Sequence, residues 1–248
     1  MVSFVLPIYN ERENLRELFA EIAAACDRRP YEIIAVDDGS TDGSWEELQL
    51  LAADSHVLVA ALRRNAGQSA ALAAGCDLAR GDIVVTLDAD GQNDPVDAGR
   101  LVDMLGGDAS LAAVVGVRVN RRDPWWKLVQ SRIANAARNW ITGDRVQDTG
   151  CGLKAVRREV LLRLPRFDGM HRFLPTLIRI QGGRVAEVPV AHRPRRHCRS
   201  KYGMWNRVFR AVRDAFGVRW LAGRRLRYEV RDVIPRDSRE AGSGKREA

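Results

Sequence analysis

The segment IVVTLDADGQNDP, residues 83–95, joins an apolar run to two carboxylates one residue apart, Asp88 and Asp90. A short apolar run that ends in polar residues is typical of a buried strand emerging at the carboxyl edge of a parallel sheet. Open α/β sheets bind their ligands at that edge. We therefore expect Asp88 and Asp90 to lie where the chemistry of this protein takes place.

Outward from this segment, the first half of the chain alternates short β-rich runs with helical patterns. The predicted strands are VSFVLPI, YEIIAVD, HVLVAAL, DIVVTLD and LAAVVGV. The predicted helices between them cover residues 11–26, 42–53, 68–79 and 95–106. This rhythm predicts an α/β fold with a mostly parallel sheet flanked by helices.

After Arg118 the regular alternation of predicted strands and helices ends. The predicted elements are a helix over 125–142, a strand over 151–156, a helix over 157–163, a strand over 184–190 and an amphipathic helix over 205–216. Aromatic residues at helical spacing are more often core than membrane contacts, whereas interleaved arginines also fit an interfacial helix. We divide the chain into one domain over 1–225 and a basic, polar tail over 226–248, predicted to be disordered at its end.

The formal net charge of +8 on the 248 residues is unevenly distributed. Residues 1–117 hold 8 basic and 20 acidic side chains, whereas residues 118–248 hold 32 and 12. The basic half indicates an anionic partner: a phosphorylated ligand, an anionic membrane surface or nucleic acid; the alternative is a merely soluble basic face. No recognised nucleic-acid-binding motif accompanies the charge, so nucleic acid is the least favoured partner.

The four cysteines lie far apart without CxxC spacing, which predicts neither a zinc site nor a disulfide framework. The start MVSFVLPIYNE lacks the long apolar core of a signal peptide. No apolar run approaches the ~20 residues of a spanning helix. We expect reduced thiols in a cytoplasm and a chain that does not itself cross a membrane.

Several of the predicted strands end in carboxylates. The stretches PIYNE, VDDGSTD and LDADGQ bring Glu11, Asp37, Asp38, Asp88 and Asp90 toward one edge. Carboxylates gathered in this way repel one another unless a cation or hydrogen-bond donors balance them. Oxygen ligands without nearby His or Cys favour Mg²⁺ or Mn²⁺ over zinc, and a nucleotide diphosphate would complete the shell of the ion.

Part of VDDGSTDGS has a purely structural explanation. Gly39 can provide a tight turn, and Ser40, Thr41 or Asp42 can cap the next helix. The two adjacent carboxylates before this turn exceed what a cap requires. We expect them to accept hydrogen bonds from a base or a ribose.

Seven ordered stretches connect the sequence to a known family: LPIYNE, VDDGSTDGS, RNAGQSAAL, ARGDIVVTLDADGQNDP, DTGCGLKAVRRE, FDGMHRFLP and HRPRRHCRSKYG. With them the chain, over roughly residues 2–225, resembles the inverting GT-A glycosyltransferases of family 2. More narrowly, it resembles the polyprenyl-phosphate sugar synthases typified by dolichol-phosphate mannose synthase. The resemblance implies a metal-dependent enzyme with a nucleotide-sugar half over 1–117 and an acceptor half over 118–225. It would transfer a hexose from a GDP-mannose or UDP-glucose type of donor to a polyprenyl phosphate, with inversion.

The resemblance also implies roles for individual residues on the donor side. Asp88, Asp90 and Gln92 would bind the metal directly or through water, and Asp90 would be essential for catalysis. The residues implied for nucleotide-sugar binding are Pro7, Tyr9, Glu11 and Asp37 at the base and ribose, Asp38 at the diphosphate, Asp88 and Ala89, and Arg199, Lys201 and Tyr202 in a closing loop. This chain has His197 and Cys198 where the family commonly has a glycine.

On the acceptor side, the resemblance implies that Arg118 and Arg132 meet the phosphate of the lipid. A phosphate monoester has a second pKa of about 6 and is largely dianionic at neutral pH, so it can attack without a dedicated base. A hydroxyl acceptor would need a base, for which Asp148 is the candidate; with a phosphate acceptor Asp148 would instead orient an arginine. His171 is expected to shape the acceptor entrance rather than to act as a base.

The expected partners are a nucleotide sugar, a polyprenyl phosphate and an anionic membrane surface, with a small integral-membrane subunit as a further candidate. We expect a peripheral protein on the cytoplasmic face of a membrane. Two alternatives remain open: a family 2 enzyme that acts on a sugar hydroxyl, and a noncatalytic, membrane-associated regulator that binds nucleotide. The intact pair of carboxylates in LDADGQ argues against the regulator.

Overall fold

The computed structural model describes residues 1–26, 29–119, 135–194 and 204–224, with side chains from residue 211 onward in the last range. Within these ranges a seven-stranded sheet has the order β3-β2-β1-β4-β6-β5-β7. The strands are β1 Val2–Ile8, β2 Tyr31–Asp37, β3 Val57–Ala61, β4 Ile83–Thr86, β5 Leu111–Arg118, β6 Lys154–Arg157 and β7 Arg184–Val190. Strands β1 to β4 are parallel, β5 and β7 are parallel, and β6 is antiparallel to both β4 and β5.

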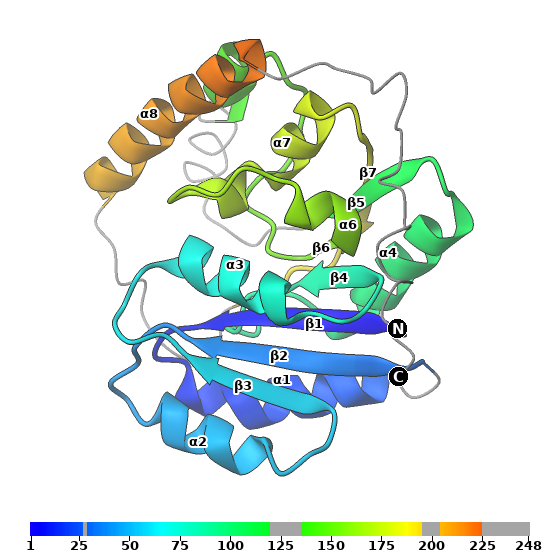
Figure 1. Cartoon of the computed structure of the whole chain (residues 1–248), viewed down its shortest axis with the longest axis vertical. Helices are drawn as coiled ribbons and strands as arrows, with labels where there is room; N and C mark the ends of the chain where they lie inside the picture. Colours follow the sequence, from blue (N-terminus) through cyan, green and yellow to red (C-terminus); the bar gives the residue numbers. More distant parts are fainter. Residues whose placement is uncertain (27–28, 120–134, 195–203, 225–248) are drawn as a thin grey trace, which may run out of the picture.

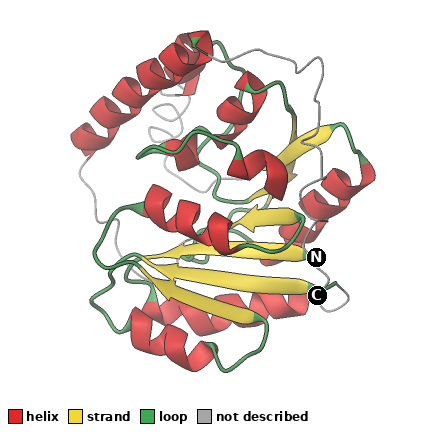
Figure 2. Cartoon of the chain, in the orientation of Figure 1, coloured by secondary structure: helices red, strands yellow, loops and turns green. Residues whose placement is uncertain are grey.

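Helices cover both faces of this sheet (Figure 1 and Figure 2). They are α1 Arg12–Ala25, α2 Ser44–Leu51, α3 Gln68–Leu78, α4 Pro95–Gly107, α6 Arg158–Leu162, the 3₁₀ turn η1 Met170–Arg172, α7 Leu174–Ile180 and α8 Met204–Gly223. Residues 135–142 are also helical. One core lies under α1, α2 and α4, and a second core lies under α3, α6, α7 and α8.

Alternation along the central strand explains the two cores. In β1, Phe4, Leu6 and Ile8 belong to the first core, whereas Val5 belongs to the second. Successive side chains of a strand point to opposite faces, so a nearly continuous apolar run fits a strand that is covered on both sides. The central strand β1 is thus almost entirely buried, whereas β3 and β7 at the two edges of the sheet are largely half-buried.

The predicted α/β architecture with a mostly parallel sheet is confirmed. Strand β4 ends at Thr86, two residues before Asp88, so Asp88 and Asp90 lie in the segment after the strand. The predicted strand over 151–156 begins three residues later, at Lys154. Of the predicted helix over 125–142, residues 135–142 are helical, and the rest lies outside the described residues.

Helix α8 is longer than predicted, and its described side chains, from residue 211 onward, are partly core and partly exposed. Ala215 and Val218 are buried in the second core. Val212 and Phe216 are 41% and 55% exposed, so the core packing that the sequence favoured is wrong for these two residues. Among the helices that the structure describes, none combines the length and the apolar character that crossing a membrane requires.

Candidate active site

The direction of β6 brings a second set of residues to the edge where the parallel strands end. In the sheet register, Thr86 of β4 and Val115 of β5 both pair with Lys154, the first residue of β6. Because β6 is antiparallel, its beginning lies beside the ends of its neighbours. The loop before β6, residues 148–153, therefore reaches the same edge as Asp88.

Asp88 is held from two sides. Gln68, the first residue of α3, donates a hydrogen bond from Nε2 to Asp88 Oδ1 over 2.8 Å. On the other side the carboxylate lies against Gly152, where any side-chain carbon would collide with it. Gly152 itself is fixed by the Thr86 hydroxyl, which donates to its carbonyl oxygen over 2.7 Å. The strand, the following helix and the 148–153 loop together set the position of this carboxylate.

Electrostatics at Asp88 indicate a site for a cation. Burial raises the pKa of Asp88, and the neighbouring charge of Asp90 raises it further, while Lys154, Arg118 and Gln68 oppose both effects. Asp90 is buried and Asp88 is half-buried, and the Asp90 Oδ1 accepts the Gln92 backbone N–H over 3.2 Å. A divalent cation would favour the ionised form of two carboxylates that otherwise repel each other.

The residues present suit Mg²⁺ or Mn²⁺ in an open site better than a metal ion enclosed entirely by protein ligands. In the part of the chain that the structure describes, no group of three or more His, Cys, Asp or Glu side chains is arranged to hold a metal ion. Magnesium typically takes one or two carboxylates and completes its shell with water and substrate phosphates. A pair such as Asp88 and Asp90 meets that requirement.

Asp37 and Asp38 accept hydrogen bonds from backbone N–H groups of nearby loops. The Asp37 carboxylate accepts the Ser40 N–H at 3.2 Å, across the tight turn that Gly39 forms with φ 72°. Asp38 accepts the N–H groups of Ala66 and Gly67 over 2.7 and 2.9 Å. Asp38 therefore orders the segment that leads into α3, a contact that the sequence did not predict, and its place beside the diphosphate stays a prediction.

The end of β1 is tied to the end of β2. Asn10, with φ 55°, donates its N–H to the Ser40 hydroxyl over 2.9 Å. The Glu11 N–H is bonded to the Ser44 hydroxyl over 3.0 Å, and the Glu11 carboxylate accepts from the Asn14 side chain over 2.7 Å. Pro7 and Tyr9 are half-buried beside them. The residues predicted to bind base and ribose thus share one corner of the edge.

Arg118 and Asp148 form a largely buried, two-pronged ion pair. Arg118 Nε and Nη2 lie 2.7 and 2.9 Å from the two carboxylate oxygens, and the side chains are 15% and 12% exposed. Gly150 leaves room for the guanidinium, since a β-carbon there would lie 2.5 Å from Nη2. Burial works against ionisation of Asp148, but the hydrogen bonds and charge of Arg118 hold its pKa below the ordinary value. Asp148 therefore orients Arg118, and the role of this pair toward an acceptor stays a prediction.

Lys154 was not among the predicted site residues. Its side chain is 4% exposed, and its Nζ donates to the Cys151 carbonyl oxygen. Burial lowers the pKa of Lys154, while Cys151, Asp88 and Asp148 raise it. A buried ammonium beside Asp88 supplies part of the positive charge that this carboxylate requires. The signal in the sequence was a lysine within the otherwise uncharged run CGLKAV, residues 151–156.

His171 is positioned by a serine. Its Nδ1 lies 2.7 Å from the Ser69 hydroxyl oxygen. Burial, and then the charges of Arg172 and Lys154, lower the pKa of His171 to about 3. An imidazole with so low a pKa is a weak proton acceptor at neutral pH, and the expected role of His171 at the acceptor entrance stays a prediction.

The remaining predicted residues, Arg132, His197, Cys198, Arg199, Lys201 and Tyr202, lie outside the described residues. The chain that leads toward the last five is anchored next to the predicted metal ligands. Arg193 donates its N–H to the Gln92 carbonyl oxygen over 2.8 Å. Its guanidinium binds Glu21 of α1 and Asp94, which caps α4.

A mostly parallel sheet of this strand order, with an Asp-x-Asp turn after β4, defines the class of GT-A glycosyltransferases. Residues 3–164 match glycosyl transferase family 2, and the chain belongs to this family. It is 40% identical over 207 residues to the undecaprenyl-phosphate 4-deoxy-4-formamido-L-arabinose transferase of Edwardsiella ictaluri, covering 82% of this chain and 63% of that protein. The protein of the same name from Aeromonas hydrophila is 40% identical over 215 residues, which cover 84% and 64% of the two chains. The chain therefore spans less than two thirds of the length of these relatives.

Solved structures show the same fold. Glucosyl-3-phosphoglycerate synthase from Mycobacterium tuberculosis, in complex with phosphoglyceric acid, aligns with a TM-score of 0.67 at 23% identity, covering 90% of this chain and 79% of that one. Its complex with Mg²⁺ and uridine diphosphate aligns with a TM-score of 0.68 at 23% identity, covering 88% and 80%. The predicted GT-A fold is confirmed.

Proposed function

We propose that this protein is an inverting glycosyltransferase that transfers a sugar from a nucleotide sugar to undecaprenyl phosphate or a similar polyprenyl phosphate and releases a nucleoside diphosphate. Membership of family 2 supports glycosyl transfer. The relatives at 40% identity are named for an undecaprenyl-phosphate acceptor. The arrangement of charge at the carboxyl edge of the sheet supports the same acceptor class.

The observation that carries this proposal is the ion pair between Arg118 and Asp148. A hydroxyl acceptor needs a proton acceptor, and Asp148 is the predicted candidate. Both of its oxygens are bonded to Arg118, and its pKa is lowered, so it is poorly suited to take a proton. A phosphate acceptor needs no base but does need cationic guidance, which an oriented Arg118, together with Arg132, would provide.

On the donor side, Asp88, Asp90 and Gln92 would hold Mg²⁺ or Mn²⁺. The bound ion would neutralise charge on the departing nucleoside diphosphate. Solved complexes of the structural neighbour include one with Mn²⁺ and UDP-glucose. The other residues proposed to bind the nucleotide sugar are Pro7, Tyr9, Glu11, Asp37, Asp38, Ala89, Arg199 and Lys201.

The sugar itself is proposed only as a class. The relatives are named for 4-deoxy-4-formamido-L-arabinose, a pentose derivative, whereas the sequence resemblance pointed to hexose donors. Recognition of individual sugar hydroxyls depends on the local geometry of loops, so GDP-mannose, UDP-glucose and a UDP-linked 4-formamido pentose all belong in a donor panel.

We also propose that the protein works as a peripheral protein on the cytoplasmic face of a membrane. Exposed apolar side chains lie on α8 and on the helical residues 135–142; they are Trp140, Val212, Phe216 and Trp220. The Arg224 guanidinium lies 5.6 Å from the Trp220 ring centroid. Aromatic side chains beside arginines suit the headgroup region of an anionic bilayer. A small integral-membrane subunit is a second candidate partner for this surface.

The test is a transfer assay with the donor panel, Mg²⁺ or Mn²⁺, and three acceptors: undecaprenyl phosphate, undecaprenol and a free oligosaccharide. We expect metal-dependent transfer to undecaprenyl phosphate alone, with an inverted anomeric configuration in the product by NMR. Transfer to the oligosaccharide but not to the lipid phosphate would establish the hydroxyl-acceptor alternative instead. Nucleotide binding without turnover of any donor would support the noncatalytic regulator.

A further inference from the structure

Ser69 lies between the donor side of the site and a loop on the other side of α3. It follows Gln68 in the first turn of this helix, and Gln68 binds Asp88. The Ser69 hydroxyl oxygen accepts the Gly169 N–H over 3.0 Å and lies 2.7 Å from His171 Nδ1. Two consecutive residues of one helical turn thus hold the metal-site carboxylate and the 169–172 turn.

The Ser69 hydroxyl joins two partners. Its oxygen accepts the Gly169 N–H, and with one proton and a second lone pair it either donates to His171 Nδ1 or accepts from it, according to the tautomer of the imidazole. The lowered pKa of His171 keeps the imidazole neutral throughout the physiological pH range. Ser69 consequently sets both the position of the loop and the orientation of the imidazole.

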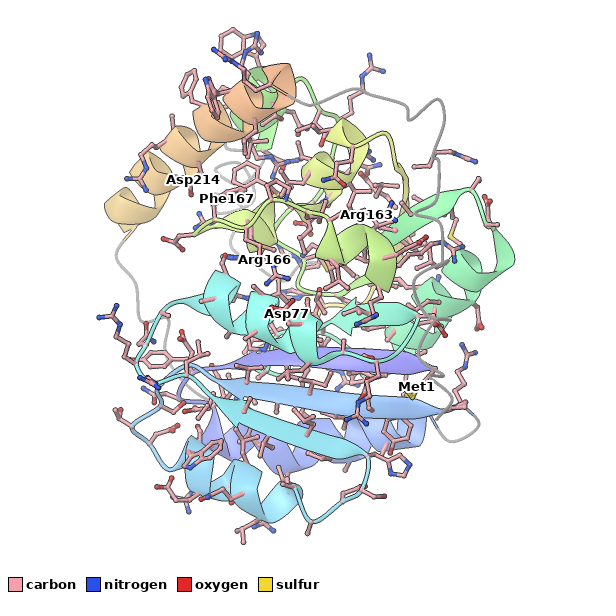
Figure 3. All side chains as sticks on the ribbon, in the orientation of Figure 1. Met1, Asp77, Arg163, Arg166, Phe167 and Asp214 are labelled. Atoms are coloured by element: carbon pink, nitrogen blue, oxygen red, sulfur yellow. The ribbon has the colours of Figure 1, made fainter. Side chains whose placement is uncertain are left out.

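The same turn is packed on its other side by α8. Gly169 has φ 96°, and a β-carbon there would lie 2.6 Å from Asp214 Oδ2, a side chain that is 9% exposed. Figure 3 shows Asp214 on α8 beside Phe167, and below them Arg166 next to Asp77 of α3. The Arg166 and Asp77 side chains form an ion pair. A continuous set of contacts therefore runs from Asp88 through α3 and the 169–172 turn to the helix that carries Phe216 and Trp220.

We propose that Ser69 is a positioning residue that couples the occupied donor site to the 169–172 turn and thereby to acceptor binding. The coupling to acceptor rests on the proposed function; the coupling to the turn does not. When metal and nucleotide fix Asp88, Gln68 and Ser69 are fixed with it, and the turn loses freedom of movement. Such a linkage is a coupling between two sites and has to be measured as one.

A matched control exists at the opposite edge of the sheet. Ser3 is buried like Ser69, accepts a glycine N–H, that of Gly81 over 2.8 Å, and donates to a side chain, Glu32, over 2.6 Å. Ser3→Ala removes the same kinds of hydrogen bond as Ser69→Ala, far from the predicted metal ligands. Any difference between the two variants beyond stability therefore reports on the position of Ser69.

The first measurement is hydrogen exchange of the peptide spanning residues 167–173, with and without Mn²⁺ and a nucleoside diphosphate. We expect the additions to slow exchange in the wild type and in Ser3→Ala, and to leave it unchanged in Ser69→Ala. His171→Asn keeps a hydrogen-bond partner for the Ser69 hydroxyl and should retain the slowing, whereas His171→Leu should lose it. Equal slowing in Ser69→Ala and the wild type, or none in the wild type, would overturn the proposal.

The second measurement is steady-state transfer to undecaprenyl phosphate. Because small misplacements of positioning groups are costly, Ser69→Ala should raise the KM for the acceptor on the order of tenfold. The Kd of the metal-nucleotide complex, measured by calorimetry, should change less than about twofold. An unchanged acceptor KM would exclude the link to acceptor binding. If the wild type transfers nothing to this lipid, the proposed function fails, and the exchange experiment still decides the role of Ser69.

Discussion

At the scale of single residues, two aspartates at the same edge have opposite environments. Burial and the charge of Asp90 raise the pKa of Asp88, whereas bonds from Arg118 hold that of Asp148 low despite burial. Asp88 lacks sufficient positive charge around it and is suited to bind a cation. Asp148 is already neutralised by Arg118. Neighbouring groups of the same type take different roles when their environments push their pKa values apart.

Replacement of Asp148 by Asn should be costly in a pH-dependent way. The change leaves Arg118 buried without its partner, which should lower the free energy of unfolding by roughly 3 kcal/mol at neutral pH. Because the folded pKa of Asp148 is depressed, its contribution is complete above the unfolded pKa of about 3.9 and is lost as the pH falls through the lower folded value. Urea unfolding should therefore show a gap between the two proteins that narrows in acid.

Asp103→Asn is the control for that prediction, since Asp103 pairs with Arg29 at the surface, where the side chains are 65% and 38% exposed. Exposed pairs typically contribute less than about 1 kcal/mol. A gap for Asp148→Asn that stays constant as the pH falls would mean that its charge contributes nothing to the fold.

Gly152→Ala should act on the chemistry. The added methyl group collides with the Asp88 carboxylate, and displacing a group that stabilises developing charge commonly costs on the order of 10²-fold in turnover. Gly99 in α4 is the matched control, because a β-carbon there meets nothing within 4 Å. Gly99→Ala should leave turnover unchanged and add up to about 1 kcal/mol of stability by helix propensity. Equal turnover in both variants would remove Asp88 from the mechanism.

At the scale of elements, hydrophobic periodicity predicted the strands and helices of the first half. Each of these elements buries apolar residues at the spacing that is typical of its own secondary structure. The direction of β6 was not predictable, since an apolar pattern carries no orientation. For that reason the sequence did not predict that Lys154 lies at the same edge of the sheet as Asp88. The roles of Gln68 and Ser69 were not predictable either, because the sequence of the first helical turn shows that these residues are polar but not which groups they contact. Their partners, Asp88 and His171, lie 20 and 102 residues away.

The exposed face of α8 supports a prediction at this scale. Replacing Phe216 and Trp220 together by Ser removes two apolar side chains that are 55% and 61% exposed. Interfacial binding scales with the apolar area inserted, so sedimentation with anionic phosphatidylglycerol vesicles should fall by on the order of tenfold or more. Leu50→Ser on α2, which removes a side chain that is 63% exposed, should leave sedimentation unchanged. Identical sedimentation of all three proteins would reject α8 as the membrane contact.

At the scale of the whole molecule, the two charged halves of the sequence meet at one edge. The acidic first half supplies Asp88 and Asp90, and the basic second half supplies Arg118 and Lys154. Opposite charges from distant parts of the chain compensate one another there only when the sheet is complete. The site should therefore form with the global fold rather than within either half.

Two buried thiols provide a test of that cooperativity. Cys26 belongs to the core under α1 and α4, and Cys76 to the core under α3. Burial raises their pKa values to about 11 and about 12, so both are protonated and covered in the native state and react only on opening. If the shared sheet makes the two cores one cooperative unit, pulse labelling in a urea series, resolved by peptide mass spectrometry, should modify both at the same midpoint. Labelling of one thiol at a urea concentration that leaves the other protected would show that one face of the sheet opens independently, and would contradict formation of the edge site together with the global fold.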